Sequence, residues 1–599
     1  MPPIRRSARG GSALAAAAAL VLLTGAAQDA PKSILPEGVF GPPATPRVAP
    51  AEPVPGATLP GAAPATPEAP PPTIDAGSEP RPGVPGPATT AANPLDSAAP
   101  TLDVSLTGLL PPSAGGYGPT VFAGSDGRVL GALMRSMQAP IASRWAHIVL
   151  VRALASIQPA PADMRPADWV AERASLLMRL GESNIALALT AQVPVDRFTP
   201  RLYGVTFDAA LAAADPTAIC PLAQTGQTLF ARPVWRLGAS MCAAFDGDDI
   251  AAAEGFQALR TEGKVDPFDV SLAERLAASA GEGAKLGANV DWGEVEQINL
   301  YRLGLGVAAG ASIPDRLIDS LPLPARAWLF SAASTPGGTR AAVAGAAAAQ
   351  GVVGSAELAG FWAAMAADPA SASIAGDTAA HLRQAYAGSA PDRMAGMRAL
   401  WEAAANGGDR YQGLVLTAGA AIALRPDKRF AGYADDLIAS ALAGGRADAA
   451  LGWWRVAANE GGDVSRRAWG LAAVADAGGG VEVSTRRFAD FRKAVGDGGT
   501  QRARLLLAAL GGLGRAGGDF DGARRELGMA PLADHWSARI DAAAAAGRVG
   551  EVAVLAGTGL QCGWADVPPA HLSHILAALV RVGRGTEARM IAAEAVTRG

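Results

Sequence analysis

Turns marked by glycine recur at a nearly constant interval along this sequence, and they limit the fold to a small set of architectures. Successive turns in the C-terminal part lie 34, 35, 33 and 36 residues apart, and three earlier ones lie 34 and 32 apart. This interval is typical of stacked helix-turn-helix units, each of which buries its apolar face only against its neighbours. Glycine suits such a turn because it adopts positive φ where a helix ends. The turns are expected at Gly445, Gly479, Gly514, Gly547 and Gly583, and earlier at Gly181, Asp215 and Gly247.

Between the turns, apolar residues follow the period of an α-helix. Leu572, Ile575, Leu576 and Leu579 occupy positions i, i+3, i+4 and i+7, and therefore form one stripe on a helix. Runs rich in Val, Ile, Thr and aromatic residues, which would indicate strands, are scarce. The sequence predicts an all-α protein, specifically an α-solenoid of helix-turn-helix repeats.

Two of the turns share a Gly-Arg start followed by a small residue, GRVGEVA at 547–553 and GRGTEA at 583–588. These stretches resemble the turn between the two helices of a tetratricopeptide repeat. The family's Trp-x-x-Leu-Gly-x-x-Tyr opening and its regular terminal Pro are missing, so the resemblance covers the period and the turns only. It implies a TPR-like right-handed superhelix with a concave groove that binds protein, and it transfers no individual binding residue.

The repeat region is expected to form two arrays, 127–330 and 331–599. Regular spacing fails between 321 and 354, where Pro322, Pro324, Pro336, Gly337 and Gly338 cluster. Because proline disrupts helix interiors, this cluster predicts a joint between the arrays.

The N-terminal segment has the order of a secretory signal peptide. Arg5, Arg6 and Arg9 precede a short apolar stretch, and small residues then give a cleavage site after Ala27. Residues 28–126 are expected to be a disordered Pro/Ala-rich linker, because twenty of the seventy residues from 31 to 100 are proline. The linker is either a spacer or ligand for a partner, or an inert leader. The protein is expected in the periplasm or secreted, with no stable membrane insertion after cleavage.

Three cysteines are present, and two of them suit an exported protein with one disulfide. Cys220 and Cys242 lie 22 residues apart on two helices that are predicted to be neighbours, whereas Cys562 has no other cysteine near it in the sequence. A bridge over such a loop contributes about 3 kcal/mol in the loop-entropy model. Two buried free thiols remain the alternative.

Residue patterns that carry chemistry are weak in this sequence. His571 and His574 lie near Cys562, but their spacing matches no standard zinc pattern, so no metal site is predicted. The G-x-G-x-x-G at 512–517 follows a predicted helix and not the strand that dinucleotide binding requires, so no cofactor is predicted. Glu182-Ser183 lacks the Gly-Leu-Met-Gln-like continuation of lytic transglycosylases. Asp435-Asp436 reads as a solvated helix start.

The predicted function is therefore non-catalytic, without catalytic residues. We expect an exported scaffold or adaptor that binds a protein or peptide partner in the cell envelope. Nucleic acid is not an expected partner, because the net charge of -4 offers no basic surface. The alternative is a cell-wall-associated enzyme, or an accessory of a peptidoglycan-processing enzyme.

Overall fold

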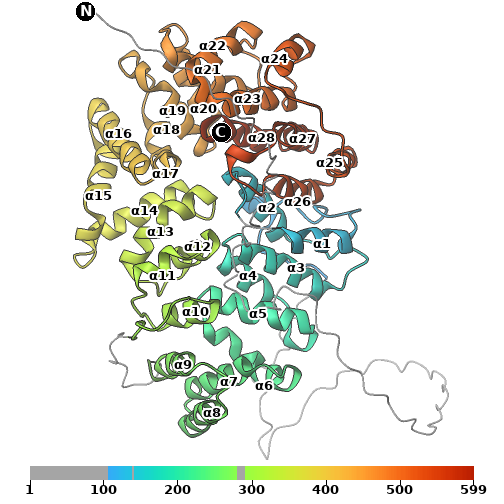
Figure 1. Cartoon of the computed structure of the whole chain (residues 1–599), viewed down its shortest axis with the longest axis vertical. Helices are drawn as coiled ribbons and strands as arrows, with labels where there is room; N and C mark the ends of the chain where they lie inside the picture. Colours follow the sequence, from blue (N-terminus) through green and yellow to red (C-terminus); the bar gives the residue numbers. More distant parts are fainter. Residues whose placement is uncertain (1–104, 138–139, 280–289) are drawn as a thin grey trace, which may run out of the picture.

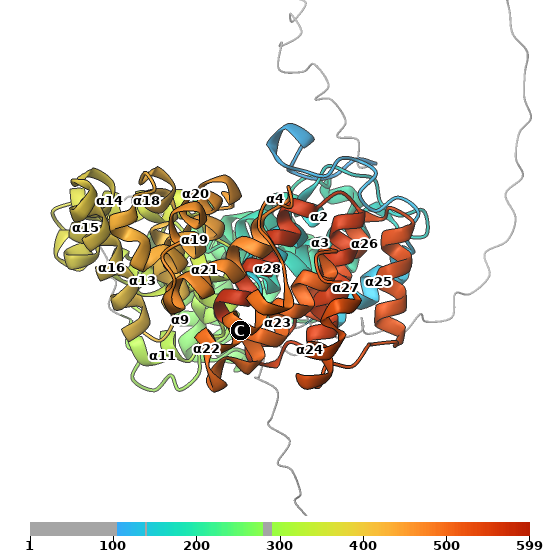
Figure 2. The same ribbon diagram turned by 90° about the horizontal axis from the view of Figure 1, so that it is seen from above.

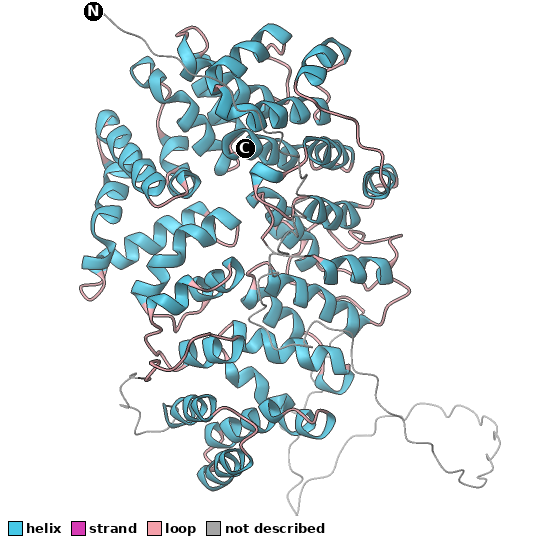
Figure 3. Cartoon of the chain, in the orientation of Figure 1, coloured by secondary structure: helices cyan, strands magenta, loops and turns pink. Residues whose placement is uncertain are grey.

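The computed structural model describes residues 105–137, 140–279 and 290–599. The regular structure of these residues is helical, and strand-like pairing is limited to two isolated bridges, Thr107 with Gln158 and Leu110 with Ser156 (Figure 3). The predicted all-α class is confirmed. None of the helices in the described ranges has the length and apolar character needed to cross a membrane. The predicted signal peptide, its cleavage site at Ala27 and most of the predicted linker lie outside the described residues.

The α-helices follow one another with short connections. Those of the first part are α1 (Gly127–Ser136), α2 (Arg144–Ala155), α3 (Pro166–Arg179), α4 (Ser183–Thr190), α5 (Pro200–Ala212), α6 (Cys220–Leu229), α7 (Pro233–Phe245), α8 (Asp249–Glu262), α9 (Pro267–Ser279), α10 (Leu300–Ala308), α11 (Asp315–Asp319), α12 (Leu323–Ser331), α13 (Gly337–Gln350) and α14 (Ser355–Ala367). Those of the second part are α15 (Ala372–Ala387), α16 (Ala390–Asn406), α17 (Arg410–Leu416), α18 (Ala418–Ala423), α19 (Ala434–Ala443), α20 (Ala447–Ala457), α21 (Gly462–Ala475), α22 (Thr485–Val495), α23 (Thr500–Gly512), α24 (Asp521–Glu526), α25 (His535–Ala545), α26 (Val549–Gly559), α27 (Pro569–Arg581) and α28 (Gly585–Arg598). Short 3-10 helices precede α1 or lie between the α-helices: η2 (Pro112–Ala114), η3 (Val195–Arg197), η4 (Pro216–Ile219), η5 (Lys428–Tyr433), η6 (Asp497–Gly499), η7 (Gly518–Phe520) and η8 (Trp564–Asp566).

The predicted turn positions have a left-handed backbone. The φ angle lies between 69° and 96° at each glycine named from the sequence: Gly181, Gly247, Gly445, Gly479, Gly514, Gly547 and Gly583. At the eighth position the left-handed residue is Ala214, with φ of 53°, and not the predicted Asp215. Ala214 is the one non-glycine residue with positive φ in the described ranges.

These turns also close with the same pair of hydrogen bonds. In the turn at Gly547, the glycine N–H donates to the oxygen of Ala544 (3.1 Å) and the N–H of Arg548 donates to the oxygen of Ala543 (3.0 Å). This is the Schellman arrangement, which satisfies the last carbonyls of a helix. The other predicted turns repeat it, except Gly479, which lies in a longer loop at 476–484. The sequence analysis missed further copies at Gly310, Gly351, Gly408 and Gly528.

Helices that are adjacent in the chain pack against each other, and many also contact the next helix but one. Thus α3 contacts α4 and α5, and α19 contacts α20 and α21. One core cluster includes residues of both predicted arrays, from Val121 to Val596. Pro322 and Pro336 are the N-cap residues of α12 and α13, where the chain tolerates proline. The predicted joint therefore coincides with two helix starts inside a continuous core.

The last described helix, α28, is surrounded by other helices. α28 contacts α19, α21, α23 and α27, and it also contacts α2 from the beginning of the described region (Figures 1 and 2). α26 contacts α1 and α2 as well. The superhelix implied by the family resemblance would keep its two ends apart, whereas here the ends pack together.

A buried carboxylate holds the two ends together. The Glu594 side chain of α28 is 2% exposed and accepts hydrogen bonds at the start of α2: from Ser143 Oγ (2.7 Å), the Arg144 N–H (2.9 Å) and the Trp145 N–H (3.3 Å). Arg598 Nη1 donates to the same carboxylate over 2.9 Å. Free N–H groups and the helix dipole favour negative charge at a helix start, so Glu594 acts as a cap for a helix about 450 residues away.

The Arg144 side chain extends this junction to two further helices. Its guanidinium is buried and donates to the backbone oxygens of Ala348 (2.9 Å), Val353 (3.3 Å) and Ala443 (3.4 Å). Ala348 and Ala443 belong to the last turns of α13 and α19, where the i+4 residue of a carbonyl group lies beyond the helix. The start of α2, the ends of α13 and α19, and α28 therefore meet at one point, which we call the central junction.

The folded region begins earlier than the predicted boundary at residue 127. The described part of the predicted linker, 105–126, packs against the helices, and Val121 and Phe122 are buried. The Phe122 ring lies 5.1 Å from that of Trp169 on α3. The buried guanidinium of Arg173 donates to the backbone oxygen of Thr107, which fastens this segment to α3. The prediction of a linker up to 126 is therefore wrong, because composition hides a few anchoring apolar residues.

One carboxyl group is buried without compensation. Asp208 of α5 is 3% exposed, and its Oδ2 atom has no hydrogen-bond partner among the residues of 105–137, 140–279 and 290–599. Burial raises the pKa of Asp208 to about 8, and only the charge of the exposed Arg232 opposes this effect. The folded protein therefore favours the protonated form of Asp208.

Substitution of Gly by Ala should change the free energy of unfolding in opposite directions at two positions. At Gly547, where φ is 69° and nothing lies within 4 Å of an added Cβ, Ala should lower the free energy of unfolding by about 1 kcal/mol through backbone strain. At Gly360, an open helical position in α14, Ala should raise it by about 0.5–1 kcal/mol. Denaturant unfolding of both variants measures the difference. If both variants changed the free energy of unfolding in the same direction, the turn would not depend on a left-handed residue at Gly547.

Breaking the central junction should be far more costly than breaking a surface ion pair. Glu594→Ala leaves buried donors unsatisfied and should lower the free energy of unfolding by about 3 kcal/mol. The matched control is Glu402→Ala, which removes the exposed partner of Arg398 and should change stability by less than about 1 kcal/mol. Thermal or urea unfolding of both variants tests this. A similar small loss for both would mean that the ends are not joined through Glu594.

The buried Asp208 should make stability depend on pH. Its folded pKa of about 8 exceeds the unfolded value, so the folded state binds the extra proton, and stability falls as pH rises from about 4 to 8. Asp208→Asn removes the charge, and should raise the free energy of unfolding at pH 7.5 by several kcal/mol, at about 1.4 kcal/mol for each unit by which that pH exceeds the unfolded pKa, while changing it little at pH 4. Urea unfolding at the two pH values measures this. The exposed Asp448→Asn should show no gain at pH 7.5, and an equal gain there would contradict the burial argument.

Candidate functional site

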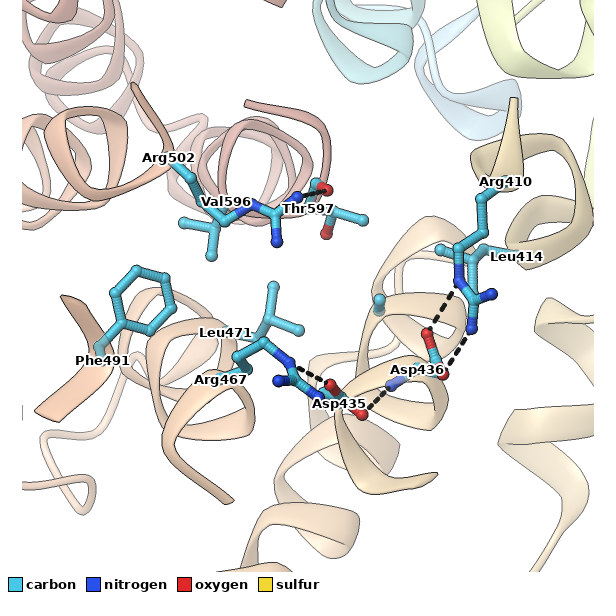
Figure 4. A pocket seen from close by; sticks show the side chains of 11 residues that line it. Arg410, Leu414, Asp435, Asp436, Arg467, Leu471, Phe491, Arg502, Val596 and Thr597 are labelled. Atoms are coloured by element: carbon cyan, nitrogen blue, oxygen red, sulfur yellow. Dashed lines mark hydrogen bonds and ion pairs between the residues drawn. The ribbon is translucent and has the colours of Figure 1, made fainter. Parts of the chain in front are cut away.

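A pocket of about 290 Å³ lies among α17, α19, α21, α22, α23 and α28 (Figure 4). Its lining combines five charged side chains with an apolar remainder. This combination of a few placed polar groups on an apolar background is typical of ligand sites. The lining residues are Arg410, Asp435, Asp436, Arg467 and Arg502, together with Leu414, Ala439, Leu471, Phe491, Val596 and Thr597. We call this site the charged pocket.

The acidic half of the charged pocket belongs to the first turn of α19. Asp435 accepts from Arg467 Nε over 2.7 Å, and Asp436 accepts from Arg410 through both oxygens, at 3.3 and 2.7 Å. The sequence analysis expected these carboxylates to be solvated, but both are half-buried and ion-paired. Burial and the charge of Asp435 raise the pKa of Asp436, against the lowering effect of Arg410.

The basic half offers hydrogen-bond donors to the cavity. Arg502 on α23 donates from Nε to an oxygen of Gly599 (3.3 Å) and from Nη2 to the oxygen of Thr597 (3.2 Å), and within the described ranges it forms no ion pair with an Asp or Glu side chain. Its Nη1, like both Nη atoms of Arg467, has no hydrogen-bond partner among the described residues. Burial and the like charge of Arg467 lower the pKa of Arg502, against the effect of Asp435.

The predicted disulfide is present. Cys220 opens α6 and Cys242 lies on α7, with their Cα atoms 5.4 Å apart. Pro221 falls in the first turn of α6, where a missing backbone N–H costs no helical hydrogen bond. The bridge therefore fastens two consecutive helices. Cys562 is the free cysteine, and burial raises the pKa of its thiol.

The two clustered histidines of α27 have structural partners. The ring of His571 packs against Trp536 with centroids 4.4 Å apart and the ring planes tilted by 31°, and His574 Nδ1 lies 3.0 Å from a carboxylate oxygen of Asp541. Among the residues that the structure describes, no three His, Cys, Asp or Glu side chains converge to hold a metal. The structure thus does not bring Cys562 and the histidines together as a ligand set.

Two other patterns noted in the sequence have structural explanations. Gly512 ends α23 where a Cβ would meet the backbone of Ser573 on α27, and Gly514 is a left-handed turn residue. The G-x-G-x-x-G stretch thus provides close helix packing and a turn. Glu182 precedes α4, and its carboxylate lies 2.9 Å from Nε2 of the buried His147 on α2. Sequence reasoning did not anticipate this buried His–Glu pair.

Sequence reasoning also missed the charged pocket, although a signal was present. Arg467 follows Asp435 by 32 residues, and Arg410 precedes Asp436 by 26. If the chain repeats every 34 residues or so, the spacing of Asp435 and Arg467 would place them on matching faces of neighbouring units, whereas the spacing of Arg410 and Asp436 falls short of one unit. No comparable signal points to Arg502, because its place depends on how α23 packs against the end of α28.

Comparison of the chain with models of known protein families, with curated proteins and with solved structures finds no match in any of the three. No relative therefore supplies a role for the residues of the charged pocket or the central junction. Their function has to be inferred from their own geometry and charge.

Proposed function

We propose that the protein is a non-catalytic, exported helical scaffold that binds a protein or peptide partner in the cell envelope. We also propose that its helices form a TPR-like repeat array, in which the last units pack against the first. The recurring Schellman turn supports the repeat, because it marks equivalent places in successive units.

The charged pocket is the observation that carries the binding role. Its charged side chains project from four helices, α17, α19, α21 and α23, and the packing of those helices fixes their positions. Guanidinium donors in the pocket have no partners in the part of the chain that the structure describes, while apolar side chains form much of its wall. A rigid site of this kind binds a ligand group at a low entropic cost, because little of it must become ordered.

The Cys220–Cys242 bridge supports the proposed location. Structural disulfides persist in oxidising compartments such as the periplasm and are rare in the cytosol. The order of residues 1–27 adds a second, independent indication of export. The two features agree with a protein that acts outside the cytoplasm.

The enzyme alternative receives less support from the charged pocket. A glycosidase-like mechanism needs a carboxylic acid that is kept protonated and free to donate. In the charged pocket, both carboxylates are bound by arginines, and the lining includes neither Glu nor His. The arrangement is therefore better suited to binding than to proton transfer.

Partner capture from the envelope tests the scaffold proposal. The full chain is expressed with its own N-terminus and crosslinked in cells, and the purified protein is sequenced from its N-terminus. We expect a mature protein that begins at Gln28 and a defined crosslinked partner. The double variant Arg467→Gln/Arg502→Gln should lose most of this partner, because it removes the open donors of the charged pocket.

Arg466→Gln is the matched control, because Arg466 neighbours Arg467 but is exposed and pairs with Asp463. It should capture the partner as well as the unaltered chain does. Equal capture by the pocket variant would contradict a binding role for the charged pocket. A chain that stays in the cytoplasm would contradict the proposed location.

A further inference from the structure

The open donors of the charged pocket belong to two guanidinium groups that share one cavity. Arg467 reaches it from α21 and Arg502 from α23 (Figure 4). Asp435 engages only Nε of Arg467, and backbone oxygens engage Nε and Nη2 of Arg502. Both Nη atoms of Arg467 and the Nη1 atom of Arg502 therefore remain available to a ligand. Two like charges in a half-buried cavity repel each other, and an anion placed between them would relieve that repulsion.

The shape and lining of the charged pocket select among anions. A guanidinium edge matches the two oxygens of a carboxylate in plane. Leu471, Phe491 and Val596 line the same cavity, so part of the wall beside the donors is apolar, although little of each side chain is exposed. Inorganic phosphate has no apolar part to place there. A carboxylate attached to a small apolar group would satisfy both parts of the lining.

The volume sets the size of the ligand. About 290 Å³ lies at the lower end of the range for small-molecule sites, which is roughly 300–1,000 Å³. A single acyl-amino-acid-sized group fits such a space, whereas a folded domain can insert only one side chain or one chain end. The charged pocket is therefore suited to one terminal group of a ligand and not to an extended segment.

We infer that the charged pocket binds a carboxylate group carried on a small apolar body, held between Arg467 and Arg502. This inference rests on the proposed binding function and names the chemistry that the site recognises. The carboxylate belongs either to a free small acid or to a peptide. The acidic residues of the pocket keep Arg410 and one nitrogen of Arg467 occupied, so the ligand contacts the remaining nitrogens of Arg467 and Arg502.

Binding of N-acetyl-leucine to the purified full chain tests the inference. Ligand-observed NMR or calorimetry should detect binding of the acid at millimolar concentration, and no binding of N-acetyl-leucine amide, which lacks the charge. Arg502→Gln and Arg467→Gln should each weaken binding by about 10-fold or more, because each removes charge-assisted hydrogen bonds. Arg466→Gln should bind within about twofold of the unaltered chain.

Arg502→Lys is a control for loss of folding, because it keeps the positive charge and removes only the planar guanidinium. This variant should bind the acid with intermediate affinity. Three results would overturn the inference: no binding of the acid, equal binding of acid and amide, or tighter binding of inorganic phosphate than of N-acetyl-leucine. A longer peptide that ends in the same leucine shows whether the carboxylate belongs to a free small acid or to a peptide. Tighter binding of this peptide supports the partner proposal, whereas equal binding supports the carboxylate site and counts against a peptide partner.

Discussion

The carboxylate of Glu594 at the start of α2 is the contact on which the closed arrangement of helices depends. It satisfies backbone donors that have no partner within their own helix, and it does so from the opposite end of the chain. Arg144 then ties the ends of α13 and α19 to the same point. In an open array the final helix would present a polar outer face to water. Here α28 is apolar on most sides, because five other helices surround it.

The parts of the fold that local chemistry determines could be predicted from the sequence. A turn that needs a left-handed residue selects glycine, so the positions of the turns and their interval were visible in advance. The helices and the Cys220–Cys242 bridge follow from similarly local patterns. Ala214 escaped notice because an alanine occupies a place where glycine is the expected residue.

The parts that distant segments determine could not be predicted in the same way. Val121 and Phe122 were assigned to the linker, because nothing nearby in the sequence shows that α3 and α26 cover them. Asp435 and Asp436 resembled ordinary surface charges for the same reason. Their partial burial comes from α17, α21 and α28, which close over them from elsewhere in the chain. The charged pocket is therefore a product of packing and not of a local motif.

The central place of α28 has a consequence for how the protein is made. Every other described helix leaves the ribosome before α28. The central junction therefore cannot form until α28 has been synthesised. Contacts between such distant segments close large loops, which slows folding and leaves apolar surface uncovered in the meantime. Loss of residues 594–599 would therefore destabilise the start of α2, which would lose the group that caps it.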